Sequence, residues 1–363
     1  MRKLLLLIVL VISVSLIASF LIADCEEEEL GEITTIGPEG QVPIWYTEIK
    51  LTSEEREKVK KMGLTIAYDQ LNISEFDDTI GFAIEDMAKK LNMKYIWTYN
   101  RMDAAVQKDN IETILAAKPD IIAAVSIDPV VSTVAFKEAI DQGAVCIFCS
   151  CKADLKWPDE YTGGLVFYDL VGFAPTLASA LNDALGGRGN VGYLYHEANF
   201  FITNQRDQGF KNALKEYPGL KIVAEEPWSG NPADAEGVVS AMITKHPEIN
   251  GIYLPWQEAA MPAISALRAA GRTDIKIVTN DIGSTTALEM ITGDNIVMMS
   301  QCDAWQYGVT VVEMGLYAIL GKEIPAECII VPGRTATKEN IEEVWPKIYN
   351  EPLPTLLKAA LKK

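Results

Sequence analysis

The chain is predicted to be an α/β protein with two lobes, each built on a parallel sheet. Short apolar runs that suit buried strands alternate with longer segments whose apolar residues recur at helical spacing. This alternation fills most of the chain after about residue 62 and is repeated in each half. Strands that alternate with helices of this length are typical of βαβ units. The length of 363 residues is sufficient for two such lobes.

The first half contains the first series of predicted elements. A helix is expected over 53–62 with Ser53 as its N-cap, because glutamates follow in its first turns. The predicted strands are 65–68, 95–98, 121–125, 145–148 and 165–167. The predicted helices after them are 79–91, 109–117, 131–142 and 172–185.

The second half repeats the pattern. Its predicted strands are 191–195, 221–224, 251–254, 275–278 and 296–300, and its predicted helices are 204–216, 234–245, 259–270, 284–292 and 305–320. Two aromatic residues, Phe200 and Phe201, lie between the first strand and the first helix of this half, and Thr203 is the expected N-cap of that helix. Proteins of this class bind ligands beyond the carboxyl ends of their strands, so this loop is an expected ligand site.

The composition limits the possible partners. The chain has 50 acidic and 32 basic side chains, a net charge of −18. Phosphate backbones are bound by clustered lysine and arginine, so no nucleic-acid partner is expected.

The N-terminus is predicted to direct export. Arg2 and Lys3 precede an apolar run, 4–23, and Cys25 follows before an acidic patch. Residues 1–24 are therefore expected to be a signal peptide. Cys25 resembles the lipidated cysteine of a lipoprotein signal, although Asp24 departs from the small residue usual there. The run is also long enough to remain as a transmembrane anchor. In either case, residues 25–61 are expected to tether the protein to the outer face of the membrane.

The other cysteines are expected to be buried free thiols. Cys146, Cys149 and Cys151 lie in and after a predicted strand, where alternate side chains face opposite ways. No histidine cluster accompanies them, so buried thiols are favoured over a metal site. No cofactor is expected.

Several motifs, weak alone but specific in their order, occur between Met62 and Pro346. They are 118–122, 204–210, 245–252, 266–272, Asp281 after 277–280, and 337–341. Together they resemble the periplasmic binding proteins of the ribose-binding type, the solute receptors of sugar ABC transporters. The resemblance implies two Rossmann-like lobes joined by three crossovers, near 167–169, 300–303 and 324–332, with the ligand in the cleft between them. The first lobe is expected to comprise 62–166 plus 303–328, the second 168–300 plus 330–350, with 351–363 as a C-terminal tail.

The resemblance implies an extracytoplasmic, monomeric solute-binding protein that delivers a sugar-like ligand to an ABC permease. A ligand-binding receptor for a signalling or chemotaxis partner is the alternative function, and a polyol, deoxy-sugar or nucleoside the alternative ligand. An enzyme is not expected, because the chain has neither a G-x-S-x-G motif nor a phosphate-binding glycine loop in the right context.

The expected ligand-binding residues follow from the chemistry of sugars. Hydroxyl groups need paired donors and acceptors, and the C–H face of a ring needs an aromatic surface. The polar residues predicted for the first role are Asp281, Gln301, Asn204, Gln257 and Asn72, and the aromatic residues predicted for the second are Phe200, Phe201, Trp228, Trp256 and Phe76.

The resemblance assigns further roles within this set. Asp281 matches the family's ligand-binding aspartate. Cys149 and Ser150 fall where many relatives have an aspartate, Asn204 replaces their ligand-binding arginine, and Trp256 replaces an asparagine. Either Gln301 or Cys302 matches the glutamine of the hinge, and Arg206 matches a structural arginine. Separately, Asp69 and Asp169 are expected to cap helices or turns.

Overall fold

The computed structural model describes residues 30–198 and 200–362. The chain divides into two units, Met1–Glu32 and Ile33–Lys363, and the description below concerns the second. The predicted signal peptide and Cys25 lie outside the described residues. Within the described ranges, no helix is both long and apolar enough to cross a membrane.

Two separate sheets form the cores of the two lobes. The seven-stranded sheet has the order β1 (Ile44–Trp45), β12 (Cys328–Val331), β6 (Leu165–Tyr168), β5 (Val145–Cys149), β4 (Ile121–Ala124), β2 (Thr65–Gln70) and β3 (Lys94–Tyr99). The six-stranded sheet has the order β13 (Gly333–Ala336), β11 (Ile296–Cys302), β10 (Lys276–Asn280), β9 (Gly251–Leu254), β7 (Gly189–His196) and β8 (Leu220–Trp228). The predicted α/β class with two sheets is confirmed. One detail was not expected: β13 pairs with β11 in the antiparallel sense.

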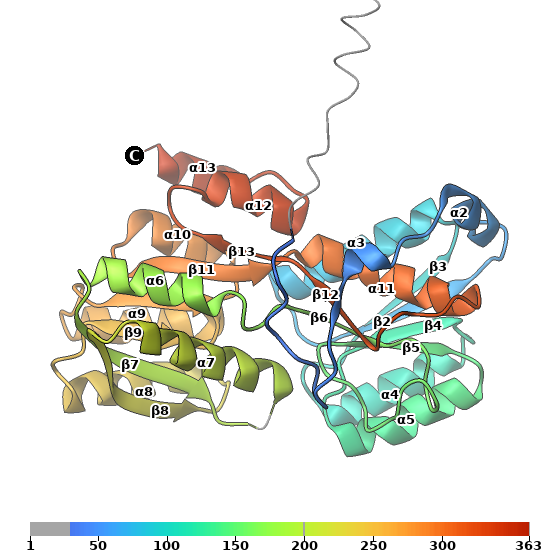
Figure 1. Cartoon of the computed structure of the whole chain (residues 1–363), viewed down its shortest axis with the longest axis horizontal. Helices are drawn as coiled ribbons and strands as arrows, with labels where there is room; N and C mark the ends of the chain where they lie inside the picture. The colour runs from blue at the N-terminus through green and yellow to red at the C-terminus, as the bar shows by residue number, and fades with distance from the viewer. Residues whose placement is uncertain (1–29, 199, 363) are drawn as a thin grey trace, which may run out of the picture. The chain divides into compact units, whose positions relative to one another are not determined.

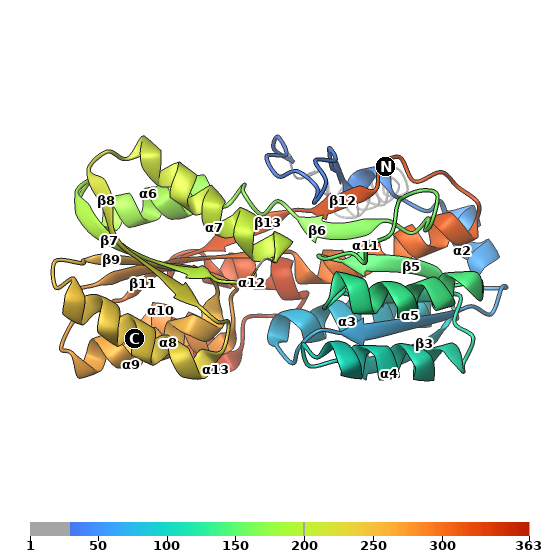
Figure 2. The same cartoon turned by 90° about the horizontal axis from the view of Figure 1, so that it is seen from below.

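Helices cover both faces of each sheet. In the first lobe, α3 (Glu75–Lys90) and α11 (Ala304–Ile319) pack together on one face, while α4 (Ala104–Leu115) and α5 (Pro129–Asp141) lie on the other (Figure 1). In the second lobe, α6 (Ala174–Ala184) and α7 (Phe201–Ala213) lie opposite α8 (Pro232–Lys245), α9 (Gln257–Ala269) and α10 (Ser284–Thr292) (Figure 2). The remaining helices are α2 (Ser53–Val59), α12 (Ile341–Tyr349) and α13 (Thr355–Leu361), with short 3-10 turns at Tyr46–Glu48 and Leu214–Glu216. Because both faces are covered, strands such as β4 and β9 are buried along their whole length.

The chain passes between the two sheets at three places: after β6, after β11 and between β12 and β13. A bidentate ion pair lies beside two of these crossings, where Arg334 Nε and Nη2 donate to the two carboxylate oxygens of Asp303, each at 2.7 Å. The ring of Phe173 packs so closely on Gly333 that a Cβ there would lie 1.8 Å from a ring carbon. Any larger residue at Gly333 would therefore require the Phe173 ring to move.

The segment expected to be a tether is packed against the lobes from Ile33 onward. Ile49 and Val59 are fully buried, and the backbone amide of Thr35 donates to Asp169 Oδ1 at 3.1 Å. The spacer prediction was therefore wrong for this part of 25–61, because its apolar residues join the core. The N-cap of α2 is Thr52 rather than Ser53, since Thr52 Oγ1 accepts from the amide of Glu55 at 3.2 Å.

The start of α7 also differs from the prediction. The helix begins at Phe201, and Thr203 lies inside its first turn instead of capping it. The Thr203 hydroxyl lies 2.8 Å from His196 Nδ1, which joins the helix to the end of β7.

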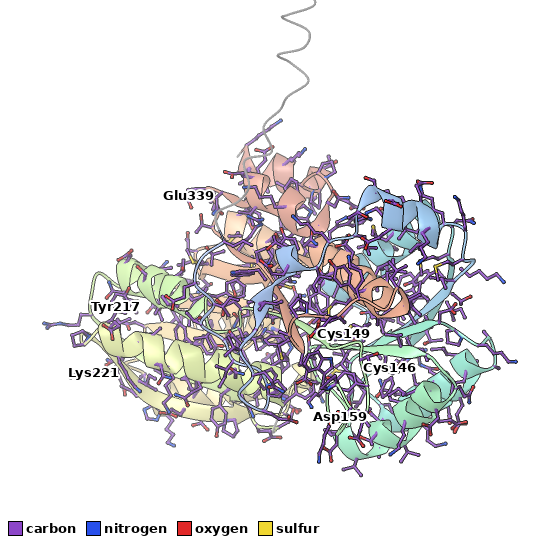
Figure 3. All side chains as sticks on the ribbon, turned by 45° about the vertical axis from the view of Figure 1, so that its right-hand side comes forward. Cys146, Cys149, Asp159, Tyr217, Lys221 and Glu339 are labelled. Carbon is purple, nitrogen blue, oxygen red and sulfur yellow. The ribbon has the colours of Figure 1, made fainter. Side chains whose placement is uncertain are left out.

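The five cysteines among the described residues are free and buried, as predicted. Two of them, Cys146 and Cys149, lie on β5 of the first lobe (Figure 3). Burial raises the pKa of the Cys146 thiol to about 12, so it is protonated at neutral pH.

Candidate functional site

A cavity of about 410 Å³ lies at the carboxyl ends of strands from both sheets. The first lobe lines it with Leu71 after β2 and Ser150 after β5, and the second lobe with His196 at the end of β7 and Asp281 after β10. Clefts at the carboxyl edge of parallel sheets are the usual ligand sites of α/β proteins, and this volume is within the range of small-molecule sites. The cavity is therefore the candidate site.

Two residues that line the cavity have a left-handed backbone. Ser150 and Asp281 each follow a strand and have a φ of 64°. Their amides continue the sheet ladders, because Ser150 N donates to the Val166 carbonyl and Asp281 N to the Ser300 carbonyl, each at 2.7 Å. A residue other than glycine in this conformation costs about 1–2 kcal/mol, and such residues are found preferentially at functional sites. The two lobes thus present equivalent strand ends to one cavity.

Aromatic rings form much of the cavity wall. Trp256, at the N-terminus of α9, has its ring centroid 4.4 Å from that of Trp228 and 5.0 Å from the imidazole of His196. Trp228 is buried behind it, with its indole N–H donating to the Asn231 carbonyl at 2.9 Å. In the first lobe, Phe76 packs edge-to-face against Tyr307. The rings offer flat apolar surface to a ligand from both sides of the cavity.

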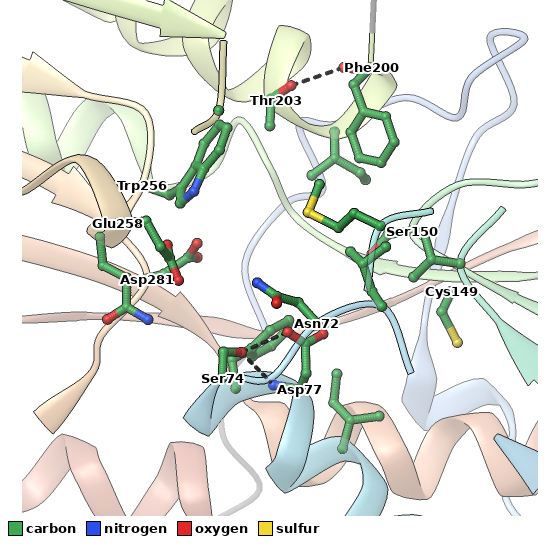
Figure 4. Close-up of a pocket in the computed structure, with 18 of the residues that line it drawn as sticks. Asn72, Ser74, Asp77, Cys149, Ser150, Phe200, Thr203, Trp256, Glu258 and Asp281 are labelled. Atoms are coloured by element: carbon green, nitrogen blue, oxygen red, sulfur yellow. Dashed lines mark hydrogen bonds between the residues drawn. The ribbon is translucent and has the colours of Figure 1, made fainter. Parts of the chain in front are cut away.

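Three carboxyl groups also line the cavity: Asp77 from α3, Glu258 from α9 and Asp281 after β10 (Figure 4). Burial, together with the charges of Asp281 and Glu258, raises the pKa of Asp77 to about 7, although a hydrogen bond from Ser74 opposes the shift. Burial and the charge of Asp281 raise the pKa of Glu258 to about 7. These groups therefore act on one another across the two lobes.

Arg206 is the single arginine or lysine among the described residues that line the cavity. Its Nη1 donates to the hydroxyl of Tyr168 at 3.0 Å and lies 3.4 Å from Asp281 Oδ1. Burial raises the pKa of Asp281, and the charge of Arg206 lowers it in part. His196 is the other basic group, but burial and the charge of Arg206 lower its pKa, so it is neutral at neutral pH.

Most of the predicted site residues line this cavity. Those present are Asn72, Phe76, Cys149, Ser150, Phe200, Trp256, Gln257 and Asp281. Whether they contact a ligand stays a prediction.

The other four predicted residues lie elsewhere. Asn204 lines a second hollow beside Tyr193 and Lys211. Phe201 packs edge-to-face on Phe167, and Trp228 supports Trp256 from behind. Gln301 is buried in β11, and its amide nitrogen has no hydrogen-bond partner among the described residues.

Several cavity residues were not predicted from the sequence. Asp77 and Glu258 lie in the first turns of α3 and α9, where an acidic residue is ordinarily explained by the helix dipole. Arg206, expected to be structural, lines the cavity as well. The signal that could have identified these residues is their position: both helices begin at the carboxyl edge of a sheet, so their first turns face the cleft.

Asp169 caps a turn as predicted, because its Oδ1 accepts from the amide of Gly172 at 3.2 Å. The capping prediction was wrong for Asp69, whose hydrogen bonds come from side chains of the first lobe. Asp69 accepts hydrogen bonds from Thr98, Asn100, Gln107 and Asn110 at distances of 2.7–3.3 Å.

One contact joins the two lobes directly beside the cavity. Glu75, the first residue of α3, accepts a hydrogen bond from the backbone amide of Ser284 at 2.5 Å and another from the Ser284 hydroxyl. Ser284 is the first residue of α10, so the carboxylate of one lobe binds the N-terminus of a helix in the other. We call this contact the Glu75–Ser284 latch.

Solved structures support the fold. An ABC transporter solute-binding protein from Agrobacterium vitis, bound with α-D-tagatopyranose, is 21% identical, covers 79% of this chain and 100% of its own, and superposes with a TM-score of 0.70. A protein from Bacillus halodurans with bound myo-inositol is 21% identical, covers 78% and 98% of the two chains, and has a TM-score of 0.67. At these identities the likeness shows the periplasmic binding protein fold alone.

Sequence relatives point to the same family. The xylitol-binding protein of Mycolicibacterium smegmatis is 23% identical over 80% of this chain and 81% of its own length. The D-apiose import binding protein of Actinobacillus succinogenes is 27% identical over 44% of this chain, a match that spans about half (53%) of that relative. The model of the periplasmic binding protein domain matches residues 65–323, which is most of the chain. The predicted resemblance is therefore confirmed: the chain belongs to the periplasmic binding protein family.

Proposed function

We propose that this protein is the extracytoplasmic solute-binding component of an ABC importer and that it binds a small sugar-like or polyol ligand between its two lobes. The observation that carries the proposal is a single cavity of about 410 Å³ to which both sheets contribute strand ends, aromatic rings and carboxyl groups. The relatives named for xylitol and D-apiose support this class of ligand.

Within the cavity, we assign the polar contacts to Asp281, Asn72 and Gln257. Each carries a planar group that can pair with neighbouring hydroxyls. Trp256, Phe200 and Phe76 provide aromatic surface for the C–H faces of the ligand. Cys149 and Ser150 form the strand end that faces Asp281. Gln301, Asn204, Phe201 and Trp228 support these residues from outside the cavity.

The two lobes expected above, 62–166 plus 303–328 and 168–300 plus 330–350, are proposed to move about the three crossings. Their bounds follow the sheets, so β1 joins the first lobe and β12 extends that lobe to Val331. A ligand that contacts both lobes favours the closed arrangement, because it binds that arrangement more tightly than the open one. The closed monomer then presents both lobes to the permease.

The protein is proposed to bind its ligand without chemical change. Burial raises the pKa of the Cys149 thiol well above its ordinary value, and the charge of Asp77 adds to this effect. The nucleophilic form of a cysteine is the thiolate, so Cys149 is poorly suited to attack a ligand at neutral pH. Export and lipidation of Cys25 would hold the protein at the outer face of the membrane.

A thermal-shift screen of aldoses, polyols and nucleosides tests the proposal, because a ligand that binds only the folded state raises the melting temperature. We expect at least one sugar or polyol to stabilise the protein and to lower its radius of gyration in small-angle scattering. A screen in which no compound raises the melting temperature would contradict the proposal. Stabilisation with an unchanged scattering profile would contradict the closure.

A further inference from the structure

The cavity has more negative than positive groups. Its described lining contains three carboxyl groups, Asp77, Glu258 and Asp281, and one guanidinium, that of Arg206. The carboxyls come from both lobes, so approach of the lobes around a neutral ligand brings like charges together. Like charges in a poorly hydrated site repel strongly, and a positive group placed between them removes the repulsion.

Arg206 does not balance all three carboxyls. Its Nη1 lies 3.4 Å from Asp281 Oδ1, and it also interacts with Asp207, a buried neighbour outside the cavity lining. Asp207 accepts hydrogen bonds from the His196 amide at 2.9 Å and the Tyr253 hydroxyl at 2.8 Å, and these hold it in place. Arg206 is therefore shared by Asp281 and Asp207, and its charge also lowers the pKa of Glu258 in part. Neither Asp77 nor Glu258 forms an ion pair with a described lining residue.

Asp77 has one oxygen available for a ligand. Ser74, the N-cap of α3, donates to Asp77 Oδ2 at 2.6 Å and accepts from the Asp77 amide at 3.0 Å (Figure 4). Within the described residues, Oδ1 of Asp77 has no hydrogen-bond donor. The residue thus keeps its place through Ser74 and still offers an acceptor to the cavity.

A second observation concerns the donor side. Arg206 is 5% exposed, and its Nε has no hydrogen-bond partner among the described residues. A buried donor without a partner is costly, and a ligand oxygen can satisfy it. The cavity therefore combines an unpartnered donor at Arg206 with a free acceptor oxygen at Asp77 and the carboxyl group of Glu258.

We propose that the ligand is an amino-substituted sugar or polyol whose ammonium group binds between Asp77 and Glu258 while a hydroxyl oxygen accepts from Arg206 Nε. The ammonium links a carboxyl of the first lobe to a carboxyl of the second and so draws the lobes together. A neutral group leaves the repulsion between these carboxyls in place. Its three N–H donors match acceptors on two sides of the cavity. This inference rests on the proposed function and narrows the class of ligand.

Matched pairs of compounds test the inference. Calorimetry at about pH 7 compares D-glucosamine with D-glucose, D-galactosamine with D-galactose, and 1-amino-1-deoxy-D-sorbitol with D-sorbitol. We expect the amino member of at least one pair to bind about tenfold or more tightly than its parent. Asp77→Asn and Glu258→Gln should each weaken that binding by about tenfold or more. Asp86→Asn, which removes a carboxylate of α3 that pairs with Lys90 outside the cavity, should leave the affinity unchanged.

The outcomes separate the two proposals. Tighter binding of a neutral member than of its amino partner in every pair that binds overturns the ammonium site and leaves the proposed function intact. Binding of an amino member that neither Asp77→Asn nor Glu258→Gln weakens also overturns the site. Failure of every compound in these pairs and in the wider screen overturns both proposals.

Discussion

Replacing Asp281 by asparagine is expected to weaken ligand binding without unfolding the protein. Asp281 has a φ of 64°, a conformation that asparagine tolerates better than most residues. The substitution therefore keeps the backbone and removes the charge that faces the cavity. Alanine is less suitable, because a left-handed alanine adds strain of about 1–2 kcal/mol.

The structure also excludes a large stability effect through helix capping. Glu75 accepts from the amide of Ser284, and the Thr286 hydroxyl accepts from the amide of Gly283 at 3.1 Å, so other residues serve the first turn of α10. An asparagine side-chain oxygen can still accept from Arg206 Nη1, and Asp207 still acts on that guanidinium. We therefore expect the free energy of unfolding of the empty protein to change by about 1 kcal/mol or less, the usual cost of losing a cap.

The expected loss of affinity follows from the hydrogen bonds that the charge accepts. A hydrogen bond to a charged group contributes about 1.5–3 kcal/mol. Loss of one such bond corresponds to at least about tenfold weaker binding. Calorimetry with a ligand from the screen measures the change, and Asp294→Asn, which alters an exposed carboxylate of the same lobe, is the matched control. Full affinity in Asp281→Asn would refute the assignment of Asp281 as a ligand contact. The main ligand contacts would then be sought at Trp256 and Cys149.

Three further predictions concern the latch, pH and the N-terminus. Glu75→Gln should weaken the Glu75–Ser284 latch and shift the protein toward the open state, so scattering of the ligand-bound variant should give a larger radius of gyration than wild type; equal values would show that the latch does not affect closure. The pKa of Asp77 is raised in the folded state to about 7, so its contribution to stability is present below its ordinary pKa of 3.8 and is lost as pH rises through about 7. The melting temperature of Asp77→Asn minus that of wild type should therefore increase over this range, and a constant difference would contradict the raised pKa of Asp77. Cys25→Ser should accumulate as an unprocessed precursor, whereas normal trimming and membrane retention of this variant would show that the tether is not a lipid.

The fold was predictable because apolar periodicity repeats in both halves of the chain. The start of α7 was not predictable in this way. A threonine before a helical pattern suits an N-cap, but in the structure the Thr203 hydroxyl contacts His196 instead. The segment after Ile33 has the composition of a spacer, because it is rich in Glu, Gly, Pro and Thr. Its burial depends on contacts with residues far along the chain, such as Asp169, that no local pattern encodes.

The site was predictable only in part for a similar reason. Asp281 and Trp256 follow predicted strands, and that position identified them. Asp77 and Glu258 have ordinary explanations as acidic residues in the first turns of helices, and their role at the cavity emerges only when the two lobes face each other. Asn204 was placed at the site by its match to a family position, but in the structure it lines a different hollow.

A crystal structure of the protein with a stabilising compound from the screen shows directly whether the ligand binds between the two lobes. We expect electron density for the compound in the cavity between Trp256 and Phe76, with a polar group within hydrogen-bond distance of Asp281. Density confined to the hollow beside Asn204, or to a surface away from the strand ends, would contradict it.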